Sequence, residues 1–193
     1  IDQFVIANVH PDVFVALGTT KYMLHENWGG SWSDADKSRK NRDDDMLCWA
    51  ASAANLLQWT RWGNVHGMTT ADQMFTYLQQ HWTDEGGSPY YALQWWFGGT
   101  DMAQGVPGWA QVDVAGGGFF PGQSLWNVIH RSSDRAQALS TIDSYLRSGY
   151  SVSFRVSTGA VNSGHFVTCW GYEFRAGNTG DYAHFGEHYY SDK

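Results

Sequence analysis

The chain has 193 residues and a formal net charge of −7, with 16% charged and 16% aromatic residues. This length is enough for one well-buried core, and sparse charge together with many Trp, Tyr, Phe and Gly residues excludes a disordered or coiled-coil chain. The negative charge disfavours non-specific binding to nucleic acid, and no apolar run is long enough to cross a bilayer. We therefore expect neither a nucleic-acid partner nor a membrane span.

Hydrophobic periodicity divides the chain into a first part with helices and a last part with strands. Helical spacing of apolar residues predicts helices over 48–62, 70–82, 89–97 and 134–147. Alternation predicts strands over 152–156, 165–170 and 187–191, and shorter β-like runs at 4–6 and 13–15. The helix ends are predicted from Thr70, Ser88 and Asp134 as N-caps and from Gly63 and Gly149 as stops.

These elements predict an α+β fold in one domain spanning 1–193. Its helical part covers about 1–148 and its antiparallel sheet part about 149–193. No closing element follows the last predicted strand, so we expect the parent protein to continue past Lys193. The glycine-rich stretch 98–122 is irregular, and a loop of this length inside a compact domain is usually functional or mobile.

Cys48 stands where the acidic run 43–45 gives way to the first long predicted helix. At a helix start the backbone N–H groups and the helix dipole favour a thiolate over a thiol, and the same N–H groups can hold an oxyanion. A cysteine is more often a small buried core residue. The residues alone leave both interpretations of Cys48 open, a nucleophile or a core residue.

A cysteine nucleophile needs a base, and His165 is the histidine best placed by its context. It begins an apolar strand after the turn 162–164, and a strand end can hold an imidazole rigidly against a helix. Asp192, at the end of the next predicted strand, is placed to accept the other imidazole N–H and fix the tautomer. A disulfide between Cys48 and Cys169 is the less favoured alternative, because the chain is not disulfide-dense.

Four segments carry a recognisable pattern in a fixed order along the chain. They are Trp32-Ser33-Asp34-Ala35-Asp36-Lys37, Asp44-Asp45-Met46-Leu47-Cys48-Trp49-Ala50-Ala51, Gly164-His165-Phe166-Val167-Thr168-Cys169-Trp170-Gly171 and Tyr190-Ser191-Asp192. Together they resemble the papain-like immunoglobulin-degrading cysteine proteases of the streptococcal Mac/IdeS type.

The resemblance implies a papain-like two-lobed fold, in which a helical lobe carrying Cys48 packs on a sheet lobe carrying His165. It implies peptide-bond hydrolysis by a triad of Cys48, His165 and Asp192, with no metal and no cofactor. It also implies an oxyanion hole formed by the Lys37 side chain and the Cys48 backbone N–H. The expected partner is a protein substrate, for which immunoglobulin is one candidate, and the expected location is secreted or cell-surface, as for a bacterial virulence factor.

The chain departs from the family pattern in three places. Lys37 lies one residue further from Cys48 than in the family, and the family's second aspartate would fall after Lys193. The middle of the chain, about 85–130, has no counterpart. We expect exosites that select the substrate in this middle region, so the resemblance implies proteolysis more strongly than it implies immunoglobulin.

Two metal-binding patterns in the sequence are incomplete. The run 184–188 fits an H-x-x-E-H pattern, which requires a helix, but Gly186 and the tyrosines that follow favour loop and strand. We expect a surface loop there. The run from Asp34 begins like a calcium loop, but Arg39 stands where that loop requires glycine. No metal site is therefore expected.

Two other functions stay open at the level of sequence. A papain-like acyl transferase or deubiquitinase uses the same triad with a different acceptor, and cleft shape rather than sequence decides between them. A binding module with a degenerate protease fold would use exposed Trp and Tyr residues on a sugar or a protein partner. An unreactive Cys48 would indicate the binding module.

Overall fold

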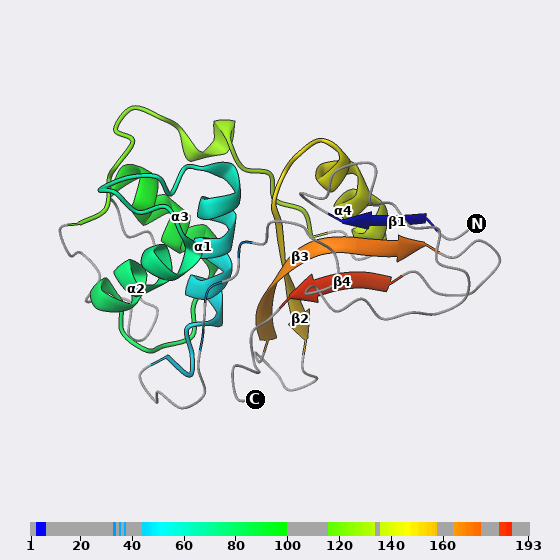
Figure 1. Cartoon of the computed structure of the whole chain (residues 1–193), viewed down its shortest axis with the longest axis horizontal. Coiled ribbons are helices and arrows are strands. Elements are labelled where there is room, and N and C mark those ends of the chain that lie inside the picture. Colours follow the sequence, from blue (N-terminus) through cyan, green and yellow to red (C-terminus); the bar gives the residue numbers. More distant parts are fainter. Residues whose placement is uncertain are drawn as a thin grey trace. The chain divides into compact units, whose positions relative to one another are not determined.

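The computed structural model describes residues 3–6, 33, 35, 37, 44–99, 116–133, 136–157, 164–174 and 182–186. Its helices are α1 (Cys48–Thr60), α2 (Ala71–His81), α3 (Pro89–Gly98), the short 3-10 helix η3 (Leu125–Asn127) and α4 (Ala138–Arg147). Its strands are β1 (Gln3–Ile6), β2 (Val152–Ser157), β3 (Gly164–Phe174) and β4 (Tyr182–Gly186) (Figure 1). The chain is therefore α+β, as predicted. No helix in the described part is both long and apolar enough to span a membrane.

The chain divides into two compact units, and segments distant in sequence contribute to each. The helical unit contains 33–132, 153–167 and 187–193, and the sheet unit contains 1–32, 133–152 and 168–186. The residues predicted to act together that the structure describes, Lys37, Cys48 and His165, all belong to the helical unit.

The core of the helical unit forms where α1 packs against α2 and α3 (Figure 1). Ala50, Ala53 and Ala54 on α1 are completely buried, and such small side chains let neighbouring helices approach closely. Large aromatic side chains fill the remaining space: Trp49, Trp95 and Trp96 are fully buried. Among the described residues, Trp82 is buried in the same core, so these four tryptophans are core residues of the helical unit.

The end of α1 differs from the prediction. The helix stops at Thr60, and Arg61 takes the left-handed conformation (φ 64°) that was expected of Gly63. Gly63 contributes to packing instead, because a Cβ at this position would overlap the side chain of Met74. The sequence correctly marked a stop, but the glycine was assigned the wrong role.

Helices α2 and α3 begin at the predicted N-cap residues. The Thr70 hydroxyl accepts a hydrogen bond from the Gln73 N–H, and the Gln73 side chain accepts one from the Thr70 N–H, which completes a capping box. Ser88 caps α3 through the Tyr90 N–H, and Pro89 occupies the first helical position. By contrast, α4 begins at Ala138, four residues after the predicted cap Asp134, which lies outside the described residues.

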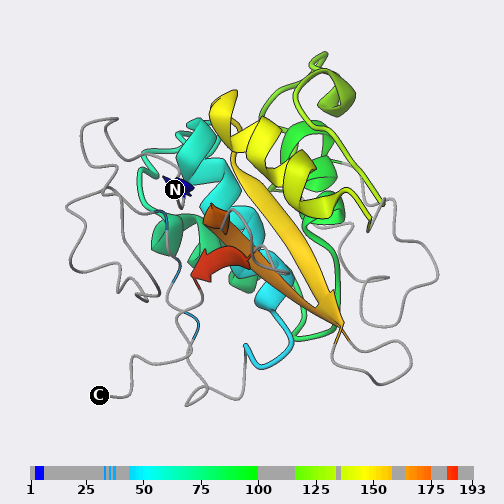
Figure 2. The same ribbon diagram turned by 90° about the vertical axis from the view of Figure 1, so that its right-hand side faces the viewer.

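Strand β3 is the central strand of a four-stranded sheet with the order β1-β3-β2, and β4 also pairs with β3. Both β1 and β4 run antiparallel to β3 and lie on either side of it (Figure 1). Figure 2 shows the long strands β2 and β3 running side by side. β1 confirms the predicted run at 4–6, and it comes from the part of the chain that was expected to be mainly helical.

β4 corrects one prediction. Residues 182–186 form a strand with Cys169 opposite Phe185 across the β3–β4 pair, whereas a surface loop was expected over 184–188, of which 184–186 are described. Pairing with β3 extends this segment, although Gly186 lowers its local strand preference. The predicted strand over 187–191 and the run at 13–15 lie outside the described residues.

Candidate functional site

Cys48 is the first residue of α1, as predicted, and its side chain is partly buried. The preceding residue, Leu47, is the N-cap and makes no side-chain capping bond. The turn before the helix is closed by a hydrogen bond from the Leu47 N–H to the Asp44 carbonyl (3.0 Å). Because the first N–H groups of a helix have no partners within the helix, this start is the type of place where an oxyanion is stabilised.

The start of α1 is held by the loop that follows α2. Met46 lies two residues before Cys48, and its N–H donates to Oδ1 of Asp84 at 2.7 Å. One residue after Cys48, the indole N–H of Trp49 donates to the Glu85 carbonyl at 2.8 Å. The Trp49 ring also packs edge-on against Trp82, with 4.9 Å between the ring centroids. One loop therefore accepts a hydrogen bond from a residue on each side of Cys48.

One face of α1 carries Cys48, Ser52 and Asn55, since positions separated by four and then three residues lie above one another on a helix. The Ser52 hydroxyl is 2.6 Å from the Ser153 hydroxyl of β2, at hydrogen-bonding distance. The Asn55 side-chain oxygen accepts a buried hydrogen bond from the Ala35 N–H at 2.8 Å. The face that begins with Cys48 thus holds a strand and an upstream segment, both of them distant in sequence.

Lys37 lies in that upstream segment and is buried, with 7% of its surface exposed. Its backbone N–H donates to the Ala35 carbonyl at 2.9 Å, so a tight turn links it to the residue that Asn55 holds. Ser33 and Ala35 are buried as well. A lysine is rarely buried to this extent, and such burial marks a residue with a specific environment rather than a solvated surface charge.

His165 is the second residue of β3 and is partly buried. Alternation along the strand puts it on the same face as Val167 and Cys169, which are both buried. Phe166, on the opposite face, packs against the core of the helical unit. The structure therefore brings the strand of His165 to the helical unit, while the pairing of its imidazole with the Cys48 thiol stays a prediction. Asp192 lies outside the described residues.

Both cysteines are thiols, so the alternative of a Cys48–Cys169 disulfide is not realised. Cys169 is completely enclosed in β3, whereas Cys48 is accessible in part. Among the described residues, no group of three or more His, Cys, Asp or Glu side chains is arranged to hold a metal ion. The two thiols therefore have different environments, which a chemical probe can distinguish.

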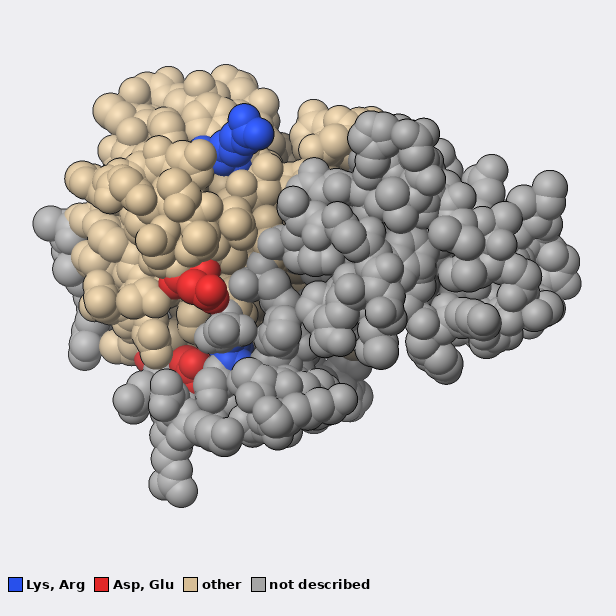
Figure 3. Space-filling view, viewed as in Figure 1, with Lys and Arg blue, Asp and Glu red and all other residues tan. Residues whose placement is uncertain are grey.

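Charged side chains are few and scattered on the face of the described part seen in Figure 3, and most of that surface carries neither sign. Near the start of α1, Asp45 and Glu85 are exposed. The described residues form no basic stripe of the kind that follows a nucleic-acid backbone on that face.

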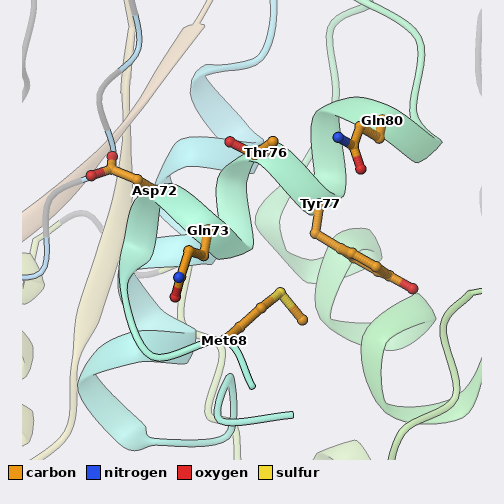
Figure 4. A pocket seen from close by; sticks show the side chains of 6 residues that line it. All are labelled: Met68, Asp72, Gln73, Thr76, Tyr77 and Gln80. Carbon is orange, nitrogen blue, oxygen red and sulfur yellow. The ribbon is translucent and has the colours of Figure 1, made fainter. Parts of the chain in front are cut away.

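A hollow of about 320 Å³ lies beside α2 (Figure 4). Five of its lining residues come from α2, and Met68 precedes the helix: Met68, Asp72, Gln73, Thr76, Tyr77 and Gln80. Neither Cys48 nor His165 is among these lining residues. Burial raises the pKa of Tyr77, whose hydroxyl donates to the Gly116 carbonyl at 2.7 Å.

Sequence reasoning did not identify Ser52, Asn55 and Asp84 as residues that organise the site. A signal for the first two was present, because a serine and an asparagine interrupt an alanine-rich apolar helix on the face of the candidate nucleophile. Asp84 gives no such signal, since it resembles any other polar loop residue.

Comparison with known proteins adds no relative: no protein-family model matches the chain, and no curated protein is significantly similar to it.

Proposed function

We propose that the chain is a cysteine endopeptidase with a papain-like, two-lobed arrangement, in which Cys48 is the nucleophile. The observation that carries the proposal is the face of α1 formed by Cys48, Ser52 and Asn55. Three of the four segments that resemble the immunoglobulin-degrading proteases contribute to it or are linked to it. Cys48 begins the face, Asn55 binds the segment of Lys37, and Ser52 binds the strand β2 that neighbours the strand of His165.

The proposed chemistry assigns one role to each residue. His165 takes the proton of the Cys48 thiol, and the thiolate attacks the carbonyl carbon of a peptide bond. The Cys48 N–H and the Lys37 ammonium stabilise the oxyanion that forms. Protonated His165 then gives its proton to the leaving amine, and water activated by neutral His165 hydrolyses the thioester. Asp192 accepts the second imidazole N–H and keeps the ring oriented.

The proposed substrate is a protein. The resemblance to immunoglobulin-degrading proteases makes immunoglobulin G the first substrate to test, and it also suggests that the protein acts outside the bacterial cell. No cofactor takes part in the proposed reaction, because the thiolate, the imidazole and the oxyanion donors complete the acyl-transfer cycle with water.

Thiol reactivity tests the proposal directly. At mildly acidic pH, iodoacetamide should alkylate Cys48 nearly stoichiometrically and leave the enclosed Cys169 unmodified, as measured by mass spectrometry of the digested protein. Incubation with immunoglobulin G should produce new chain termini, and Cys48→Ala should abolish them. Equally slow alkylation of Cys48 and Cys169, or undiminished cleavage by Cys48→Ala, would overturn the proposal.

A binding module is the second candidate, and an exposed aromatic group favours it. Trp126 on η3 has 57% of its surface exposed, and its ring lies 5.4 Å from that of Tyr90. The Arg131 guanidinium stands 5.7 Å from the centre of the same Tyr90 ring. Trp, Tyr and Arg are the residue types that most often dominate binding at protein interfaces. An unreactive Cys48, together with loss of partner binding in Trp126→Ala, would favour this function over hydrolysis.

A further inference from the structure

We propose that Asn55 is a positioning residue that places the Lys37 oxyanion donor relative to the Cys48 thiol. The inference rests on the proposed function and goes beyond it, since neither the sequence pattern nor the resemblance assigns a role to Asn55. It follows from how Asn55 connects α1 to the segment that contains Lys37.

Asn55 lies two turns after Cys48 on the same face of α1, and only 4% of its surface is exposed. Its side-chain oxygen accepts the Ala35 N–H at 2.8 Å, across twenty positions of sequence. A buried backbone N–H that loses its acceptor incurs a desolvation penalty, so the segment has a strong preference for this position. The bond therefore fixes the distance along α1 at which residue 35 lies.

The position of Ala35 is passed on to Lys37 by the backbone. The Lys37 N–H donates to the Ala35 carbonyl at 2.9 Å, which closes a tight turn between the two residues. Burial of both side chains restricts the segment further. Cys48 is thus part of α1, and Lys37 is held to the same helix through Ala35 and Asn55.

Such an arrangement has a functional consequence because oxyanion stabilisation depends steeply on geometry. A donor must lie about 2.7–3.1 Å from the developing oxyanion, and a displacement of about 1 Å can cost on the order of a hundredfold in rate. Replacing Asn55 should therefore lower kcat while leaving KM nearly unchanged, since the affected contact forms in the transition state.

A double-mutant cycle in the full chain separates positioning from a general structural role. The probe is immunoglobulin G, with cleavage followed by the appearance of new termini, and Cys48→Ala serves as the blank. We expect Lys37→Ala to lower kcat about a hundredfold and Asn55→Ala about tenfold. In the Lys37→Ala background, Asn55→Ala should lower kcat by less than about twofold, because the group that Asn55 positions is already absent.

Two further variants complete the test. Asn55→Asp keeps an acceptor oxygen for the Ala35 N–H and should retain most of the wild-type kcat. Asn55→Ser has a shorter polar side chain, whose oxygen does not reach the Ala35 N–H. This variant replaces Asn55→Ala in the cycle should the alanine variant fail to fold. Thr70→Ala is the matched control, since loss of the α2 cap should lower stability by a similar amount with kcat unchanged.

The outcomes distinguish the inference from the function on which it rests. Full additivity of Asn55→Ala and Lys37→Ala, in a protein whose cleavage depends on Cys48, overturns the positioning role alone. A fall of kcat in Thr70→Ala equal to that in Asn55→Ala overturns it as well, because stability would then explain both. Cleavage that persists in Cys48→Ala overturns the proposed function, and the inference with it.

Discussion

Helix α1 begins at Cys48 without a capping side chain, whereas α2, which packs against it, begins with a complete capping box at Thr70. In α2 the orphan N–H groups are satisfied by side chains three residues apart, so the start is stabilised locally. In α1 the start is fixed by Asp84 and Glu85, which are more than thirty residues away in sequence.

The difference shows that a helix start can be ordered by residues distant in sequence as well as by a local capping box. A capping side chain on α1 would occupy first-turn N–H groups that the proposed chemistry needs for an oxyanion. The bonds from Met46 and Trp49 lie on either side of Cys48 and use one N–H outside the helix and one indole. The start of α2 is thus stabilised within one turn, and the start of α1 is stabilised by a loop distant in sequence.

The largest expected difference between the two starts concerns turnover. Cys48→Ala should lower the rate of protein cleavage by at least about a thousandfold, since the remaining groups provide no nucleophile. Its thermal unfolding should match the wild type within a few degrees, because Cys48 is only partly buried. The rate is measured by cleavage of immunoglobulin G, and a residual rate within tenfold of wild type would contradict the assignment.

Among the residues that hold the two helix starts, Asp84→Ala should have the largest effect. Loss of the acceptor for the Met46 N–H should lower the free energy of unfolding by about 1 kcal/mol and kcat by roughly threefold to tenfold. Asp84→Asn keeps an acceptor oxygen and should lie close to wild type in both measurements, by urea titration and by cleavage assay. If the asparagine variant loses as much as the alanine variant, the charge of Asp84 matters and the hydrogen bond does not.

Thr70→Ala tests the comparison at the start of α2. Removal of the cap should lower the free energy of unfolding by about 1 kcal/mol, because the Gln73 N–H loses its acceptor. The rate of Cys48 alkylation by iodoacetamide should change by less than about twofold. A parallel loss of stability and of thiol reactivity would mean that the two helix starts are coupled, and the distinction between them would fail.

The smallest expected effect is a change in the free energy of unfolding at alkaline pH, caused by Tyr77 on α2. Burial raises the pKa of Tyr77, so the folded state favours the neutral phenol more than the unfolded state does. This contribution to stability is complete below the unfolded pKa of about 10 and is lost as the pH rises above it. Urea unfolding at pH 8 to 11 should show a steeper loss for wild type than for Tyr77→Phe, and identical slopes would refute this assignment.

Local chemistry accounts for the parts of the fold that were predicted correctly. The starts of α2 and α3 and the end of α4 follow from residues within one turn of the boundary, such as Thr70 and Ser88. The same reasoning failed at Gly63, where the close approach of the Met74 side chain, and not a left-handed backbone, distinguishes the position. It also failed at β4, since its strand conformation accompanies pairing with β3.

The candidate site was predicted only as far as its residues appear in sequence patterns. The position of Cys48 at a helix start was correct because an acidic run followed by small apolar residues predicts a helix boundary. The residues that hold the site together, Asn55 and Asp84, were missed because their partners lie far away in the chain. The pairing of Cys48 with His165 and Asp192 stays a prediction.

The sequence by itself determined the α+β class, the starts of α2 and α3 and the placement of a thiol at the first residue of α1. Only the tertiary structure decided that Lys37 is buried, that Asn55 binds the segment containing it, and that α1 depends on the loop of Asp84. The physical reason is the range of the interactions. Caps and periodicity act within one or two turns, whereas the bonds that organise the site join residues 20, 38 and 101 positions apart.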